Sequence, residues 1–121
     1  MSQIKIGKLF EFEAAHQLPD EEIYGNCSRM HGHSYKLAIE IEGKCSQAGM
    51  VMNFKDLKAI VNKLIINVYD HSNLNDFFAL PTAEVMVLHF FDILRMALPK
   101  SIQLRKVELW ETSGSYAKIE R

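Results

Sequence analysis

The stretch between Cys27 and His33 holds the densest group of chemically active side chains, with a thiol and two imidazoles within seven residues. His31 and His33 are two positions apart, so on an extended strand both rings leave the same face and can bind one ion. A further histidine, His16, precedes them in the chain. Metal binding is therefore the first chemistry that the sequence suggests.

The segments that carry these histidines alternate between apolar and polar side chains, as half-buried strands do. Residues 4–17 form one such segment, in which His16 shares the parity of Phe10. The alternation resumes at His31, with His33 again on the apolar parity. If the two strands pair antiparallel, all three histidines lie at the same end of the sheet, and their rings can converge on one point.

Three histidines without a ligand carboxylate suit zinc, which binds neutral imidazole nitrogen and, in catalytic sites, keeps a fourth position open. Each ring taken alone could equally be a half-buried, hydrogen-bonded histidine, but the convergence favours a metal site. Cys27 could be a fourth ligand of a closed structural site, or a reactive thiolate beside an open one. The spacing alone does not separate these two roles.

The middle of the chain predicts two helices. Asn53 is a suitable N-cap for a helix whose apolar residues recur at helical spacing and which ends near Tyr69. Thr82 is a suitable N-cap for a second helix, which stops at Pro99. The first helix carries one apolar stripe and the second runs through an apolar-rich stretch, so both can cover a sheet.

Two further strands are expected near the C-terminus, at 107–112 and 116–119, while residues 18–30 read as a loop. The order strand, strand, helix, helix, strand, strand predicts an α+β fold in a single domain, 1–121. We expect a four-stranded antiparallel sheet with two helices on one face. So small a sheet has edges to protect, and oligomerisation is one way to cover them.

Two other positions could contribute chemistry. Asp70 and His71 follow the first predicted helix and fit a general acid or base with an orienting carboxylate. A histidine at a helix C-terminus is equally ordinary, because it interacts with the helix dipole. Glu111 ends an otherwise apolar row and could anchor a ligand that donates paired N–H groups, unless that strand end is simply solvated.

The composition narrows the class of partner. The chain has 14 basic and 15 acidic side chains and a net charge of −1, which gives no electrostatic reason to expect a nucleic acid or an anionic membrane. No apolar run approaches the ~20 residues that span a bilayer, and the N-terminus lacks an apolar signal core. We expect a cytoplasmic protein with a small-molecule ligand, in which Cys27 and Cys45 remain thiols.

A larger set of motifs runs along nearly the whole chain: Phe10–Ala15 before His16, Cys27 with His31–Tyr35, Gly49–Val51 before Phe54, Asp70–His71 with Leu74–Asn75, Pro81–Glu84, and Glu111–Thr112. Together these motifs resemble the 6-pyruvoyltetrahydropterin synthase family. Three residues separate Cys27 from His31. That spacing resembles the bacterial 6-carboxytetrahydropterin synthases of queuosine biosynthesis, whereas the pyruvoyl enzymes carry a longer spacer.

The resemblance implies a T-fold, whose subunits assemble through their sheets into a barrel, as a trimer or a hexamer, with active sites between subunits. It implies a zinc ion held by His16, His31 and His33. It also implies that Cys27 is a base and not a ligand.

The remaining family roles fall on residues of the second half of the chain. Asp70 with His71 would come from a neighbouring subunit, and Glu111 would anchor the pterin ring. Thr82 and Glu84 would line the pterin pocket.

The implied activity is that of a zinc-dependent lyase that converts 7,8-dihydroneopterin triphosphate to 6-carboxy-5,6,7,8-tetrahydropterin, with loss of acetaldehyde and triphosphate. The alternatives are a 6-pyruvoyltetrahydropterin synthase, which eliminates triphosphate and keeps the side chain, and a non-catalytic zinc- or pterin-binding module. Two positions depart from the family pattern. Asn53 replaces the usual aspartate and still suits a helix cap, and Val85 replaces a frequent asparagine and removes a polar group.

Overall fold

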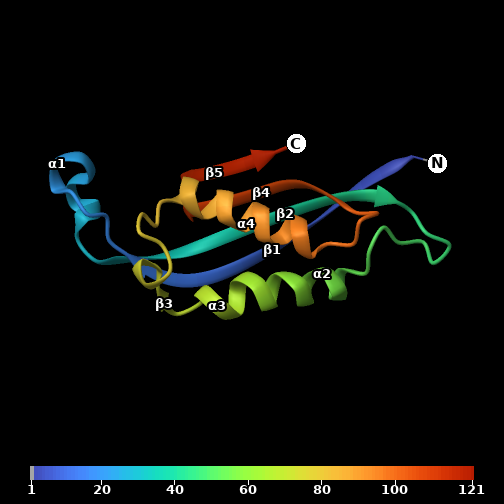
Figure 1. Ribbon diagram of the computed structural model, residues 1–121, viewed down its shortest axis with the longest axis horizontal. Coiled ribbons are helices and arrows are strands. Elements are labelled where there is room, and N and C mark those ends of the chain that lie inside the picture. The colour runs from blue at the N-terminus through green and yellow to red at the C-terminus, as the bar shows by residue number, and fades with distance from the viewer. Residues whose placement is uncertain (1) are drawn as a thin grey trace.

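The computed structural model describes residues 2–121 and shows a twisted sheet with helices packed on one face (Figure 1). The strands are β1 (Gln3–His16), β2 (His31–Lys44), β3 (Ser72–Asn73), β4 (Gln103–Thr112) and β5 (Ser115–Glu120). They lie in the order β3-β1-β2-β4-β5. The predicted α+β class is therefore confirmed.

The predicted four-stranded antiparallel sheet is wrong in two respects, because the sheet has five strands and is mixed. β3 pairs parallel to β1 at Ala14 and Ala15, while the other neighbouring strands pair antiparallel. A strand of two residues is too short to produce an alternating pattern in the sequence. The pairing of β3 depends on the tertiary structure, which brings Ser72 and Asn73 to the edge of β1.

The two long helices form where the caps predict them. α2 (Phe54–Val61) continues through a π-helical turn, Asn62–Ile66, into α3 (Asn67–Tyr69). α4 spans Ala83–Ala97. The Asn53 side chain accepts a hydrogen bond from the Lys55 N–H at 2.9 Å, and Thr82 Oγ1 accepts one from the Val85 N–H at 3.2 Å. The predicted loop additionally contains a short helix, α1 (Glu21–Tyr24).

Alternate residues of the strands face the helices and form the core. Phe12, Tyr35 and Leu37 are at most 2% exposed, whereas Leu9, on the opposite face, is 77% exposed. A shift of one residue in the pairing would turn this apolar row outward, so burial fixes the register. Within residues 2–121, no helix is both long enough and apolar enough to cross a membrane.

Candidate metal centre

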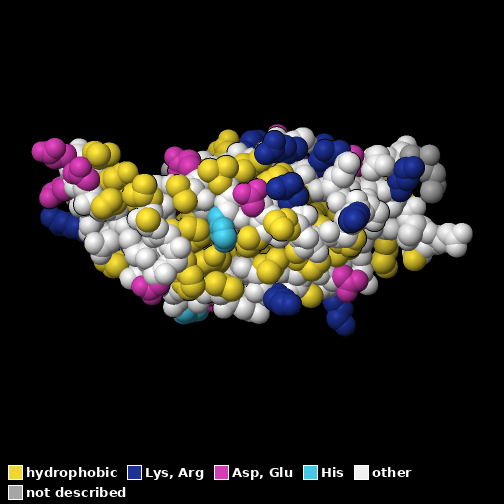
Figure 2. All heavy atoms as spheres, viewed as in Figure 1, with side chains coloured by type: hydrophobic (Ala, Val, Ile, Leu, Met, Phe, Trp, Pro, Cys, Tyr) yellow, Lys and Arg dark blue, Asp and Glu magenta, His cyan; other side chains and the backbone are white. Residues whose placement is uncertain are grey.

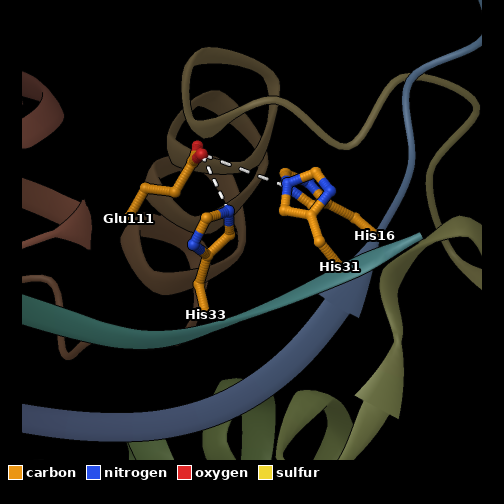
Figure 3. A group of neighbouring side chains, drawn as sticks. All are labelled: His16, His31, His33 and Glu111. Carbon is orange, nitrogen blue, oxygen red and sulfur yellow. Dashed lines mark hydrogen bonds and ion pairs between the residues drawn. The ribbon is translucent and has the colours of Figure 1, made fainter. Parts of the chain in front are cut away.

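Four side chains converge at one end of the buried sheet face: His16, His31, His33 and Glu111 (Figure 3). Each offers one ligand atom, and these atoms all lie within 4.8 Å of one another. The strand register produces this convergence, because His16 pairs directly with His31 across β1 and β2. β4 lies on the other side of β2 and brings Glu111 to the same end.

Two of the histidines are oriented by backbone carbonyl groups. His16 Nδ1 donates to the carbonyl oxygen of Pro81 at 2.7 Å, and His31 Nδ1 donates to that of Arg29 at 2.6 Å. A carbonyl oxygen can only accept a hydrogen bond, so Nδ1 carries the proton in both rings. The Nε2 atoms of both rings therefore face the centre, as they do in histidines that bind a metal.

These two inward nitrogens lie close together. His16 Nε2 is 2.9 Å from His31 Nε2. With both Nδ1 atoms protonated, a hydrogen bond across this gap requires a second proton on one Nε2 atom, and a metal ion in its place would accept a lone pair from each ring. Two nitrogens bound to one tetrahedral zinc ion lie about 3.3–3.4 Å apart, so a small relaxation would seat the ion.

His33 adds a third unsatisfied nitrogen. Its Nε2 atom is buried, lies 3.0 Å from Glu111 Oε1, and makes no hydrogen bond within residues 2–121. Burial lowers the pKa of His33; Glu111 raises that pKa, while His16 and His31 lower it further. The ring is therefore held in the neutral form, which is the form that binds a metal.

Tyr35 forms an apolar floor beneath the group. Its ring centroid lies 5.6 Å from that of His33 and 6.3 Å from that of His16. Burial raises the pKa of the Tyr35 hydroxyl, and the nearby Glu111 adds to that rise. The hydroxyl is neutral at physiological pH and water is excluded from this side of the group.

The converging group contains the three predicted histidines and, in addition, a carboxylate. Glu111 belongs to the converging group and Cys27 does not. Sequence spacing missed the contact because it depends on the pairing of β4 with β2, two segments far apart in the chain. The four donors fit a metal ion, since imidazole nitrogen and carboxylate oxygen are both ordinary zinc ligands.

Cys27 lies on the loop that joins β1 to β2. It occupies a 3₁₀ turn, Gly25–Ser28, and its side chain is an exposed free thiol, whereas Cys45 is a free thiol that is half-buried. The Leu18 N–H donates to the carbonyl oxygen of Cys27 at 2.8 Å, which closes the base of the loop. Figure 1 shows this loop, with α1, extending beyond the end of the sheet.

Asp70 and His71 lie at the outer edge of β1. The Glu13 N–H donates to Asp70 Oδ1 at 2.8 Å, and His71 Nδ1 lies 3.0 Å from Asp70 Oδ2. The pKa of Asp70 is lowered, first by the Glu13 N–H and then by the bond and charge of His71. The carboxylate is therefore ionised and orients the imidazole.

The backbone at His71 is unusual. Its φ is 60°, in the left-handed region that non-glycine residues rarely adopt. The side chain is 79% exposed and lines an open cavity of about 380 Å³ together with Glu13 and Ser34. Within one chain, this ring does not join the converging group. A rarely adopted conformation that holds an exposed histidine is typical of functional positions.

The start of α4 touches the converging group through its backbone. Pro81 is buried and supplies the carbonyl that orients His16, while Thr82 is half-buried as the helix cap. Glu84 and Val85 are exposed on the first turn. The sequence did not predict the roles of the Pro81 and Arg29 carbonyl groups. Every residue type has a backbone carbonyl oxygen, so residue type does not indicate which one orients a histidine.

Sequence comparisons match this chain, over nearly its whole length, to one family of known proteins. A sequence profile described as 6-pyruvoyl tetrahydropterin synthase matches residues 5–121. A relative from a Synechocystis species, named 6-carboxy-5,6,7,8-tetrahydropterin synthase, is 41% identical over 93% of this chain and 90% of its own length. A Haemophilus influenzae protein of the same name is 32% identical over 96% and 98%.

The solved structures include a close match in fold. The 6-pyruvoyl tetrahydropterin synthase of Caenorhabditis elegans superposes with a TM-score of 0.88 and 26% identity. The alignment covers 100% of this chain and 97% of that one. The match therefore extends through the sheet, both long helices and the connecting loops.

Proposed function

The chain belongs to the 6-pyruvoyl tetrahydropterin synthase family, and from this membership and the geometry of the converging group we propose that it is a 6-carboxytetrahydropterin synthase. The substrates would be 7,8-dihydroneopterin triphosphate and one water molecule, and the products 6-carboxy-5,6,7,8-tetrahydropterin, acetaldehyde and triphosphate. The observation that carries the proposal is the convergence of three inward-facing imidazoles and a carboxylate at one end of the sheet.

We assign a zinc ion to His16, His31 and His33, whose Nε2 atoms face one point. When bound there, zinc would supply a Lewis acid that polarises the side-chain oxygens of the substrate. Once the nitrogens are engaged, the Glu111 carboxylate is free to accept the paired N–H groups of the pterin ring. Thr82 and Glu84 would contribute to the same pocket from the start of α4.

Cys27 is the proposed base. As a thiolate it would remove a carbon-bound proton next to the developing carbonyl group of the substrate, and a nearby cation would favour the thiolate form. His71, oriented by the ionised Asp70, would return a proton as general acid. Three residues lie between Cys27 and His31, the spacing that favours the carboxy product.

We propose that the complete active site forms between subunits of a trimer or hexamer. Within the described residues, β3 covers only Ala14 and Ala15 of the outer edge of β1, and β5 pairs on one side alone. Both edges can accept a strand from another copy. Such an assembly would bring the exposed Asp70–His71 pair of one subunit to the converging group of the next.

Product analysis by mass spectrometry tests the proposal. Purified, zinc-loaded protein incubated with 7,8-dihydroneopterin triphosphate should yield the 6-carboxy product and acetaldehyde. A product that keeps the three-carbon side chain would instead support the pyruvoyl synthase, which the likeness to the C. elegans enzyme makes the second candidate. Absence of turnover, together with unfolding on chelation, would support a zinc-stabilised binding module.

A further inference from the structure

A second cavity lies at the opposite end of β4 from the converging group. It has a volume of about 550 Å³ and opens between α4, the start of β4 and the residue that follows β5. Its lining includes the side chains of Arg95, Arg105, Arg121, Phe91, Ile102 and Leu104. Figure 2 shows dark blue side chains gathered on this face, over α4 and near the end of β5.

The basic residues that line this cavity are all arginines. The sequence contains four arginines and ten lysines, and three of the four arginines line this cavity whereas no lysine does. Guanidinium groups bind phosphate oxygens in pairs through a planar fork of N–H donors, which a lysine cannot do. The lining also holds one carboxylate, Asp92, which pairs with Arg95. Because the basic groups of the cavity are all guanidinium groups, they indicate recognition of a phosphate group or a similar oxyanion.

The arginines keep donors available. The Arg105 guanidinium lies 3.4 Å from the Glu42 carboxylate and also contacts the Gln103 side chain. Arg95 lies 3.7 Å from Asp92, one turn earlier on α4. Each contact uses one nitrogen of a group that has five N–H donors. The three guanidinium groups thus meet only two side-chain carboxylates, Asp92 and Glu42, and most of their N–H donors remain available for a ligand.

Arg121 is held differently. Its guanidinium carbon lies 5.1 Å from the centroid of the Phe91 ring, and its backbone N–H donates to the Arg105 carbonyl oxygen at 2.8 Å. Within residues 2–121 it makes no ion pair with a side-chain carboxylate. The aromatic contact positions the guanidinium over the cavity without neutralising its charge.

We propose that this cavity binds a phosphate-bearing small anion at a site separate from the converging group. Arg105 and Glu111 stand six residues apart on β4, which corresponds to about 20 Å along an extended strand. The two sites therefore do not share a ligand. The cavity volume suits a small molecule, and its apolar wall, Phe91, Ile102 and Leu104, offers contact to an organic part beside the phosphate.

Titration calorimetry with the zinc-loaded full chain tests the site, with inorganic triphosphate and a nucleoside triphosphate as the two probes. We expect saturable binding that weakens at least about tenfold in Arg95→Gln and in Arg121→Gln, because each loses a charge-assisted hydrogen bond to phosphate. Lys58→Gln, which removes an exposed positive charge on α2, is the matched control and should bind like the unchanged protein. Arg105→Gln is compared only after its melting temperature has been measured, because it also leaves Glu42 unpaired.

The two probes separate the sources of affinity. Equal binding of both means that the arginines recognise phosphate alone, and tighter binding of the nucleotide adds a contribution from the apolar wall. The proposal is overturned if neither probe binds saturably, or if Lys58→Gln weakens binding as much as the arginine variants do. It is also overturned if binding disappears in His31→Ala but persists in both Arg95→Gln and Arg121→Gln, since the phosphate would then occupy the metal centre.

Discussion

His16 of the converging group lies on β1 and the Asp70–His71 pair is hydrogen-bonded to the same strand, yet the two arrangements are built in opposite ways. His16 is 1% exposed and held by a backbone carbonyl, whereas His71 is 79% exposed and lies on the outer edge. The first arrangement is complete within one chain. The second leaves an oriented acid–base pair exposed at the sheet edge, away from the converging group of the same chain. The contrast shows that metal binding and proton transfer place different demands on this fold.

The largest effect is expected at the metal centre. His31→Ala should remove bound metal and lower turnover at least about a thousandfold, because both the Lewis acid and the substrate anchor are lost. Metal analysis and steady-state kinetics measure the two losses. Lys55→Ala, on the far helix, serves as the control. Full metal content in His31→Ala would show that this ring is not a ligand.

Cys27→Ala sharpens the contrast between the converging histidines and the exposed thiol. Turnover should fall about a hundred- to ten-thousandfold, as for loss of a general base, while about one zinc per chain is retained. Cys45→Ala is the matched thiol control and should keep its activity. Loss of zinc together with activity in Cys27→Ala would instead make this thiol a ligand.

His71→Ala tests whether the edge pair acts on another subunit. Alone, it should lower turnover about a hundredfold or more and leave the metal content unchanged. When it is mixed with Cys27→Ala and the subunits are allowed to exchange, about a quarter of the sites should carry both intact groups. Recovery of activity on mixing is the expected result. If subunit exchange is demonstrated and the mixture of His71→Ala and Cys27→Ala remains inactive, each active site is formed within one chain.

The smallest effect concerns the stability of the chelated protein. The folded state lowers the pKa of His33 below 6.5, so the unfolded state binds more protons as the pH falls through 6.5. The free energy of unfolding should therefore be largest above that pH and decrease below it. Urea unfolding at about pH 8 and about pH 5.5 measures the difference. A stability that does not change between them would mean that the ring is as free to protonate as in the unfolded chain.

Much of the fold could be predicted because its signals are local. The alternation around Phe10 and the caps at Asn53 and Thr82 each depend on neighbouring residues, and the structure confirms the elements they predict. β3 escaped prediction because a pair of residues at a sheet edge has no periodicity. The π-helical turn at Asn62–Ile66 was not predicted for a similar reason, since a single turn of five residues is too short to show a period of its own.

The sequence by itself determined that His16, His31 and His33 share one face at one end of two strands, because side-chain direction follows parity and antiparallel pairing aligns the ends. Only the tertiary structure decided how those rings are used. It supplied the Pro81 and Arg29 carbonyls that turn the lone pairs inward, and it brought Glu111 to them. Such contacts join segments far apart in the chain and depend on backbone position, which residue spacing does not record.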